Sequence, residues 1–235
     1  MFRKSSALAR GAKLAAVAAS GCVVLAACGP VQLGAAAIMG GQRISTASLA
    51  TQVSDLTRSY HAEGSKAQLG FPVAQMPQQV LAWLVRFRVR ETMASQQGIR
   101  VSVKQQQQAI SEIEAQAHQG GQTATLTQLA VANGLPPDLI SDLGVYQAIA
   151  DALVNRLDGG HAPTSQTAQQ ALSQQFNKDQ CLAAKSLHIK INPQYGRVDY
   201  TTLGIVAAPN TLSAPGASAS PSASPSAAPR YVPPC

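Results

Sequence analysis

Cysteine and histidine are the side chains with the most versatile chemistry, and this sequence contains four of each. Two histidines four residues apart on one helix face form a common metal-binding arrangement. No two histidines here have that spacing, so we interpret each one as a solvated surface residue and predict no metal site. They are His61, His118, His161 and His188.

The remaining chemistry-bearing side chains form no recognisable catalytic motif. The 11 acidic residues are scattered, and there is no Walker A loop, nucleophile elbow or dinucleotide-binding fingerprint. Gly34, Gly40 and Gly41 form no phosphate loop, because no Lys-Ser or Lys-Thr pair follows them. A catalytic triad assembled in space from distant residues leaves no such motif in the sequence. We nevertheless expect a protein that is not an enzyme, with no catalytic residues, no cofactor and no small-molecule substrate.

The first 27 residues have the layout of a secretory signal peptide. Residues 1–13 contain four cations and no acid, and residues 14–27 are uncharged. A spanning helix needs about 20 apolar residues, so this run of 14 residues is too short to cross a membrane as a helix. We therefore predict an export signal that is removed.

Cys28 follows this run in the sequence Leu25-Ala26-Ala27-Cys28-Gly29, which resembles the lipobox of bacterial lipoproteins. The resemblance implies cleavage before Cys28 and attachment of diacylglycerol to its thiol. With a further acyl chain such as palmitate, the protein would stay anchored, because two acyl chains hold a protein far longer than one. We expect it on the extracytoplasmic face of the cell membrane. The alternative is an ordinary small-residue cleavage site followed by a chance cysteine.

Two further cysteines, Cys181 and Cys235, remain after the predicted cleavage. A disulfide between them is possible in an oxidising compartment, but the favoured interpretation is a half-buried Cys181 and an unpaired Cys235. The charge is also modest. Loss of the four signal cations leaves 14 basic and 11 acidic residues. With no basic cluster interleaved with aromatics, we expect no binding to nucleic acid.

The composition predicts a single folded domain with a short tether before it and a disordered tail after it. Residues 213–235 are mostly Ser, Ala and Pro, and such a stretch cannot bury enough apolar surface to offset its chain entropy. We predict a disordered tail there, a short tether over residues 28–34 and one domain over residues 35–212. That length is sufficient for a single core.

The domain is predicted to be mainly helical, with about six helices and a sheet of two or three strands. Helix signals are a capping residue, apolar residues spaced by three and four, and a glycine beyond the last turn. They predict helices over 45–63, 77–97, 102–119, 125–133, 136–158 and 164–184. The second is apolar on more than one face, which is typical of a buried central helix. Alternating or β-branched runs predict strands over 35–39, 187–191 and 198–206, with the first pairing to one near the C-terminal end.

Four residues of the second predicted helix are candidates for binding roles. Trp83 could line a peptide groove, but we interpret it as a core aromatic residue. Arg86, Arg88 and Arg90 could attract acidic partners, and we interpret them as solvated.

The order of these segments resembles the N-terminal chaperone domain of the SurA family of extracytoplasmic foldases, which is similar to the chaperone domain of trigger factor. Gly40–Ser45 matches the strand that leads into the first long helix of that family. The segments at 98–102 and 134–139 match the starts of the third and fifth helices. The resemblance covers roughly residues 35–205.

The chain departs from that family at one place. Many members insert a parvulin prolyl isomerase domain between the fifth and sixth helices, where this chain has only residues 158–163. The resemblance therefore implies chaperone binding of unfolded or nascent exported polypeptides without isomerase activity, and it assigns no substrate-binding residue. The alternatives are a structural lipoprotein that binds one dedicated cell-envelope partner, and an unrecognised enzyme or small-ligand carrier.

Overall fold

The computed structural model describes residues 34–64, 67–119, 124–161 and 163–208. The predicted signal peptide, the predicted lipid site Cys28 and the predicted tail over 213–235 lie outside these residues. The described part contains six α-helices and a few short antiparallel strands, which confirms the mainly helical class. The helices are α1 Thr46–Glu63, α2 Met76–Gln96, α3 Val103–Gln119, α4 Leu126–Ala132, α5 Ile140–Leu157 and α6 Gln166–Ser186.

Capping residues begin four of these helices. The hydroxyls of Ser45 and Ser165 accept hydrogen bonds from the backbone N–H groups of Ser48 and Ala168 at 2.9 and 3.1 Å. Ser102 and Thr125 each exchange reciprocal hydrogen bonds with a glutamine three residues later. Each cap satisfies backbone donors that a helix start leaves unpaired, so local sequence sets these boundaries. The fifth helix begins later than predicted, because a 3-10 turn over Pro137–Leu139 comes first.

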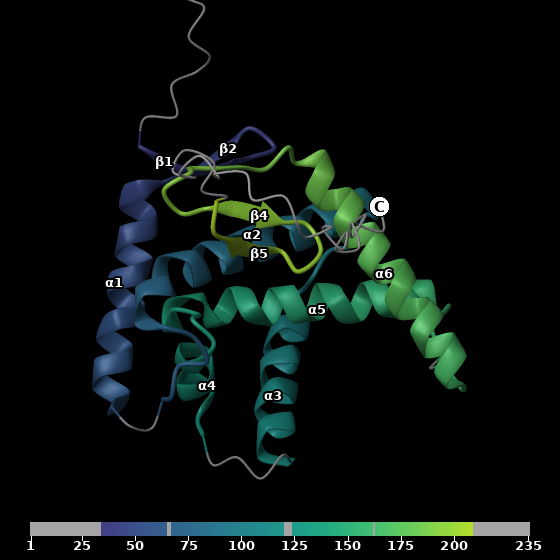
Figure 1. The fold of residues 1–235 in the computed structure, drawn as a ribbon. Helices are drawn as coiled ribbons and strands as arrows, with labels where there is room; N and C mark the ends of the chain where they lie inside the picture. The colour runs from purple at the N-terminus through teal and green to yellow at the C-terminus, as the bar shows by residue number, and fades with distance from the viewer. Residues whose placement is uncertain (1–33, 65–66, 120–123, 162, 209–235) are drawn as a thin grey trace, which may run out of the picture. The chain divides into compact units, whose positions relative to one another are not determined.

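Helix α2 forms the centre of the core, as its apolar faces predicted (Figure 1). Ten of its residues are buried. Val85, Val89 and Met93 pack with residues of α5 and α6, whereas Val80 and Leu81 pack with α1. This helix therefore joins the N-terminal and C-terminal halves of the fold.

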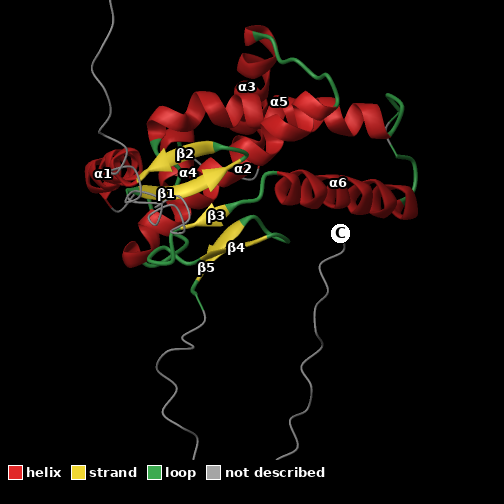
Figure 2. Ribbon diagram, turned by 90° about the horizontal axis from the view of Figure 1, so that it is seen from above, coloured by secondary structure: helices red, strands yellow, loops and turns green. Residues whose placement is uncertain are grey.

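Short strands cover one side of the helices (Figures 1 and 2). Strand β1 Ala35–Met39 lies between β2 Gln42–Ser45 and β3 Lys190–Ile191, and both pairings are antiparallel. Ile38 of β1 is opposite Lys190 of β3. The predicted pairing of the first strand with a segment near the C-terminal end is confirmed.

Two predicted strands have different bounds in the structure. The segment predicted over 187–191 is a strand only at β3, because His188 adopts a left-handed conformation with φ of 46°. The segment predicted over 198–206 is a hairpin of two strands, β4 Arg197–Asp199 and β5 Gly204–Val206. The Asp199 carboxylate accepts hydrogen bonds from the Thr201 backbone and the Thr202 hydroxyl, and this turns the chain between them.

Helices α3 and α5 approach each other closely at Gly144. A Cβ atom at Gly144 would lie 2.9 Å from the backbone oxygen of Gln106 and 2.7 Å from Ile110 Cγ1. The Gln106 side-chain amide also donates to the Ser141 carbonyl at 2.8 Å. From this crossing α3 projects on the side away from the strands (Figure 1). The absent side chain at Gly144 therefore sets the distance between the two helices.

Candidate functional site

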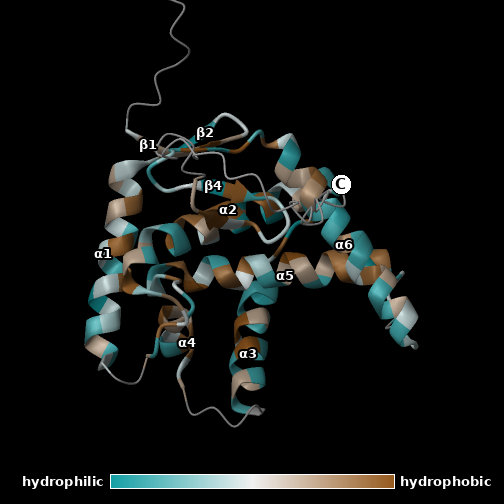
Figure 3. Ribbon diagram, viewed as in Figure 1, coloured by the Kyte–Doolittle hydropathy of each residue, from teal (hydrophilic) through white to brown (hydrophobic). Residues whose placement is uncertain are grey.

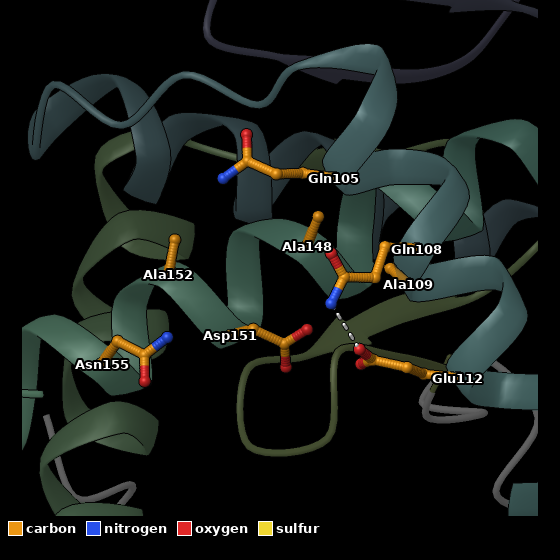
Figure 4. A pocket seen from close by; sticks show the side chains of 8 residues that line it. All are labelled: Gln105, Gln108, Ala109, Glu112, Ala148, Asp151, Ala152 and Asn155. Carbon is orange, nitrogen blue, oxygen red and sulfur yellow. Dashed lines mark hydrogen bonds between the residues drawn. The ribbon is translucent and has the colours of Figure 1, made fainter. Parts of the chain in front are cut away.

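The candidate site is a groove of about 350 Å³ between α3 and α5 (Figure 4). Three alanines, three side-chain amides and two carboxylates line it. They are Gln105, Gln108, Ala109 and Glu112 of α3 with Ala148, Asp151, Ala152 and Asn155 of α5. We refer to this hollow as the α3/α5 groove.

Small residues form the floor of the α3/α5 groove. Ala109 and Ala148 are buried, and Ala152 is half-buried. Because alanine extends only one carbon from the backbone, these positions leave space that longer side chains would fill. The close crossing at Gly144 keeps the two walls near each other, so the groove follows from the pattern of small residues on two helices.

The walls of the groove are polar. The Gln108 amide donates to the Glu112 carboxylate at 3.0 Å, a contact drawn in Figure 4. Across the groove, the Gln147 amide donates to Asp151 Oδ1 at 2.9 Å. Gln105 and Asn155 add further amides that can both donate and accept hydrogen bonds. An extended polypeptide has the complementary backbone groups.

The electrostatic environment of the groove raises the pKa of Asp151. Partial burial is the largest cause, and the hydrogen bond from Gln147 opposes it. The negative charge of Glu112 raises the pKa further, whereas the positive charge of Arg90 lowers it. A cationic side chain entering between Asp151 and Glu112 would relieve the repulsion between the two carboxylates.

Arg90, whose charge acts on Asp151, is not the solvated residue that the sequence predicted. Its side chain is buried, with 4% of its surface exposed. The guanidinium lies 4.2 Å from the Tyr146 ring centre and 4.6 Å from that of Phe176. It donates to the Tyr146 hydroxyl at 2.9 Å and to Gln180 Oε1 at 3.3 Å. Arg90 therefore joins α2, α5 and α6 by stacking on aromatic rings.

The other two arginines are also held by neighbours. Arg88 pairs with Glu91 at 3.1 Å, and Arg86 lies over the Trp83 ring at 5.0 Å. Burial lowers the pKa of Arg86, opposed by the charge of Tyr146. The default interpretation as freely solvated residues is thus wrong for Arg90 and incomplete for its neighbours. Sequence spacing alone gave no sign of the aromatic partner on α5.

Trp83 is part of an aromatic cluster at the edge of the core. Its ring lies 5.7 Å from Phe87 and 6.2 Å from Tyr146, measured between ring centres. The indole N–H donates to the Asn133 carbonyl at 3.0 Å. Trp83 is half-buried. This packing agrees with its interpretation as a core aromatic residue.

Two further hollows adjoin α6. One, of about 500 Å³, lies between α2, α5 and α6, and its lining includes Gln97, Arg156 and Leu182. We call it the α6 hollow. Another, of about 400 Å³, lies between the end of α5 and the start of α6, where Leu157 and Leu172 line it. Figure 3 shows that much of α6 is hydrophilic.

The structure does not bring the four histidines together at one site. All four histidines are exposed, as predicted. Within the described residues, no three His, Cys, Asp or Glu side chains are grouped to hold a metal ion. Cys181 is buried and disulfide-bonded, which corrects its interpretation as an unpaired cysteine. Sequence reasoning missed the α3/α5 groove, although the alanine spacing on the two helices could have indicated it.

A comparison with known protein families, curated proteins and solved structures finds no match for the chain. Across the described residues, none of the helices is both long enough and apolar enough to cross a membrane.

Proposed function

We propose that this protein is a membrane-anchored extracytoplasmic lipoprotein that acts as a non-catalytic chaperone or folding factor for exported proteins. Lipid on Cys28 would hold it at the membrane, and the folded domain would bind unfolded or nascent chains. The anchor would raise the effective concentration of binding sites where chains emerge, without any change in intrinsic affinity.

The α3/α5 groove is the observation that carries this proposal. Its amides match the backbone N–H and C=O groups of an extended chain, which every unfolded protein offers. The alanine floor adds apolar contact without a shaped pocket, and aromatic residues make up only 4% of the sequence. Such a surface favours weak binding of many sequences over tight binding through a few aromatic anchors.

The finer fold assignment is part of the same proposal. A SurA-type chaperone domain would have an N-terminal strand leading into the first long helix and a small sheet completed by a segment near the C-terminal end. The pairing of β1 with β3 and the cap at Ser45 support that assignment. Only residues 158–165 separate α5 from α6 in the sequence, so no isomerase activity is included.

One observation favours the alternative, a lipoprotein with a single dedicated envelope partner. Within the described part, the exposed large apolar residues are dispersed over four elements: Val73, Val103, Leu182 and Val206. Chaperones that capture unfolded chains through hydrophobic contact usually present a continuous apolar patch. A polar groove on a surface whose exposed apolar residues are dispersed also suits one partner of defined sequence.

An aggregation assay distinguishes the two functions. Residues 29–235 would be mixed with a chemically unfolded exported protein at several molar ratios, and light scattering would be followed. We expect suppression near equimolar ratio and no binding to the native client. No suppression at large excess, together with one stoichiometric partner in membrane crosslinking, would support the dedicated-partner function instead.

Matched variants connect this activity to the α3/α5 groove. Replacing Gln108 and Asn155 with alanine removes two amides from the groove walls and leaves the cap between Ser102 and Gln105 in place. We expect weaker suppression at unchanged stability. The control replaces Gln107 and Gln174, exposed glutamines outside the groove, with alanine. Equal loss in both variants would contradict a role for the groove.

A further inference from the structure

The disulfide of Cys181 points to a second covalent feature of this protein. Cys181 lies in α6, and 3% of its surface is exposed. It is disulfide-bonded, and the other cysteines of the chain, Cys22, Cys28 and Cys235, all lie outside the described residues. The partner is therefore one of these three.

We propose that Cys235 is the partner, and that this disulfide seats residues 231–234 over the α6 hollow. The choice of partner rests on the proposed export and lipidation. Cys22 would leave with the signal peptide, and the Cys28 thiol would be consumed in its bond to the lipid. Cys235 is the cysteine that keeps a free thiol for pairing.

The α6 hollow lies within one helical turn of Cys181. Asp179 and Leu182 contribute to its lining, and they flank Cys181 in the sequence. Leu182 is 47% exposed and is among the few large apolar side chains that the described surface leaves uncovered. A chain segment bonded to Cys181 thus begins beside the exposed Leu182, in a hollow whose other exposed lining residues are polar or charged.

The sequence next to Cys235 suits this surface. Residues 231–234 are Tyr, Val, Pro and Pro, whereas residues 213–229 are Ser, Ala, Pro and Gly. The tyrosine and valine supply the apolar contact that Leu182 lacks. Proline has no backbone N–H, so two of the four residues bring no donor that would need a partner on packing.

The chain is long enough to make this connection. The described residues end at 208, shortly after β5, which leaves 27 residues to reach Cys235. An extended chain spans at most about 3.5 Å per residue, or roughly 90 Å. By comparison, α6 with its 21 residues is about 30 Å long at 1.5 Å per residue. The reach is ample from any point near β5.

Formation of the bond needs an oxidant of defined class. Two thiols lose two protons and two electrons as the sulfur–sulfur bond forms. A disulfide-bearing oxidant of the extracytoplasmic space accepts both by thiol–disulfide exchange and leaves as two thiols.

Peptide mapping without reduction tests the pairing. The full chain would be produced in a bacterium that exports it, its free thiols alkylated, and the protein digested with trypsin. Cleavage after Lys178, Lys185 and Arg230 yields peptides 179–185 and 231–235, and we expect them linked by one disulfide. Linkage of 179–185 to a peptide containing Cys22 or Cys28, or alkylated Cys181, would overturn the proposal.

The same digest separates this inference from the lipoprotein proposal. Lipid mass on Cys28 is read from a different peptide, so each result stands alone. A 181–235 linkage without lipid would support the disulfide and contradict the anchor. Lipid on Cys28 with Cys181 alkylated would do the reverse.

Hydrogen exchange tests whether the segment covers the hollow. We expect residues 179–186 and 93–97 to lose protection in Cys235→Ser, while α1 is unchanged. Tyr231→Ser with Val232→Ser keeps the disulfide but removes the apolar contact, and we expect it to lose protection around Leu182 as well. Unchanged exchange at Leu182 in both variants would show that the segment does not rest there.

Discussion

Arg90 is a cation held in the core by aromatic rings and not by a carboxylate. Two of its guanidinium nitrogens, Nε and Nη1, have no hydrogen-bond partner among the described residues. Burial lowers its pKa, opposed by the charge of Tyr146 and the hydrogen bond to it. Unpaired buried donors are costly, so the charge of Arg90 contributes less to stability than its packed side chain does.

Substitutions at Arg90 separate packing from charge. We expect Arg90→Ala to lower the free energy of unfolding by about 2–4 kcal/mol, because it leaves a cavity between Tyr146 and Phe176. Arg90→Met fills most of that space without unpaired donors and should cost less than about 1.5 kcal/mol. Urea unfolding measures both values. Equal losses in the two variants would mean that the charge itself stabilises the fold.

Asp151 predicts a pH dependence of stability. Its pKa is raised in the folded protein, so the folded state holds a proton that the unfolded state has released. Stability therefore falls as pH rises from about 3.8, the ordinary value, through the raised folded pKa. Asp151→Asn should remove the contribution of Asp151 to this fall, and unfolding measured from pH 3.5 to 7 would show a flatter curve; the raised pKa of Asp142 keeps a part of the fall. Gln107→Ala, a substitution of an exposed uncharged residue of α3, is the control and should keep the wild-type slope.

At the scale of elements, the starts of four helices and the core face of α2 could be predicted from sequence. Capping and apolar spacing are local, so residues such as Ser45 and Ser165 indicate them directly. The hairpin β4–β5 could not be predicted in this way, since the apolar run through 198–206 conceals its turn. Leu203 has φ of 51° there yet is almost fully buried, so burial outweighs its unfavourable backbone conformation.

The α3/α5 groove likewise depends on contacts between elements. Periodicity shows that each helix has small residues, but which small residues face each other follows from the crossing at Gly144. The surroundings of Arg90 could not be predicted for the same reason, because Tyr146 and Phe176, whose rings contact it, lie 56 and 86 positions further along the chain. Sequence reasoning therefore identified the elements of the site without bringing them together.

The crossing itself can be tested by Gly144→Ala. Alanine gains about 1 kcal/mol of helix propensity over glycine, but its Cβ would contact the Gln106 backbone at 2.9 Å. Overpacking of this kind costs about 1–3 kcal/mol, so we expect a net loss of up to about 2 kcal/mol in thermal or urea unfolding, with a changed α3/α5 groove. Ser141→Ala, exposed on the same helix, should stay within about 0.5 kcal/mol of wild type. A more stable Gly144→Ala protein would show that α3 shifts freely.

For the whole molecule, the proposed anchor predicts where the protein is found. Cys28→Ser would remove the thiol that receives lipid, and we expect the protein to leave the membrane fraction for the soluble envelope or the medium. Metabolic labelling with a palmitate analogue and membrane fractionation measure this. Cys22→Ser lies in the predicted signal peptide and should remain lipidated and membrane-bound. Membrane retention of the unlabelled Cys28→Ser protein would contradict the lipid anchor.

The pairing of β1 with β3 has a consequence for the order of folding. Ile38 and Lys190 are opposite each other in the sheet although some 150 positions separate them in the chain. A chain that emerges from its N-terminal end first presents β1 long before β3 exists. The helices between them form from local contacts. The edge of β1 that pairs with β3 stays open until β3 is made, and β3 lies near the start of the last tenth of the described sequence. Before β3 arrives, a protein proposed to receive unfinished chains is itself an unfinished chain with an exposed strand edge.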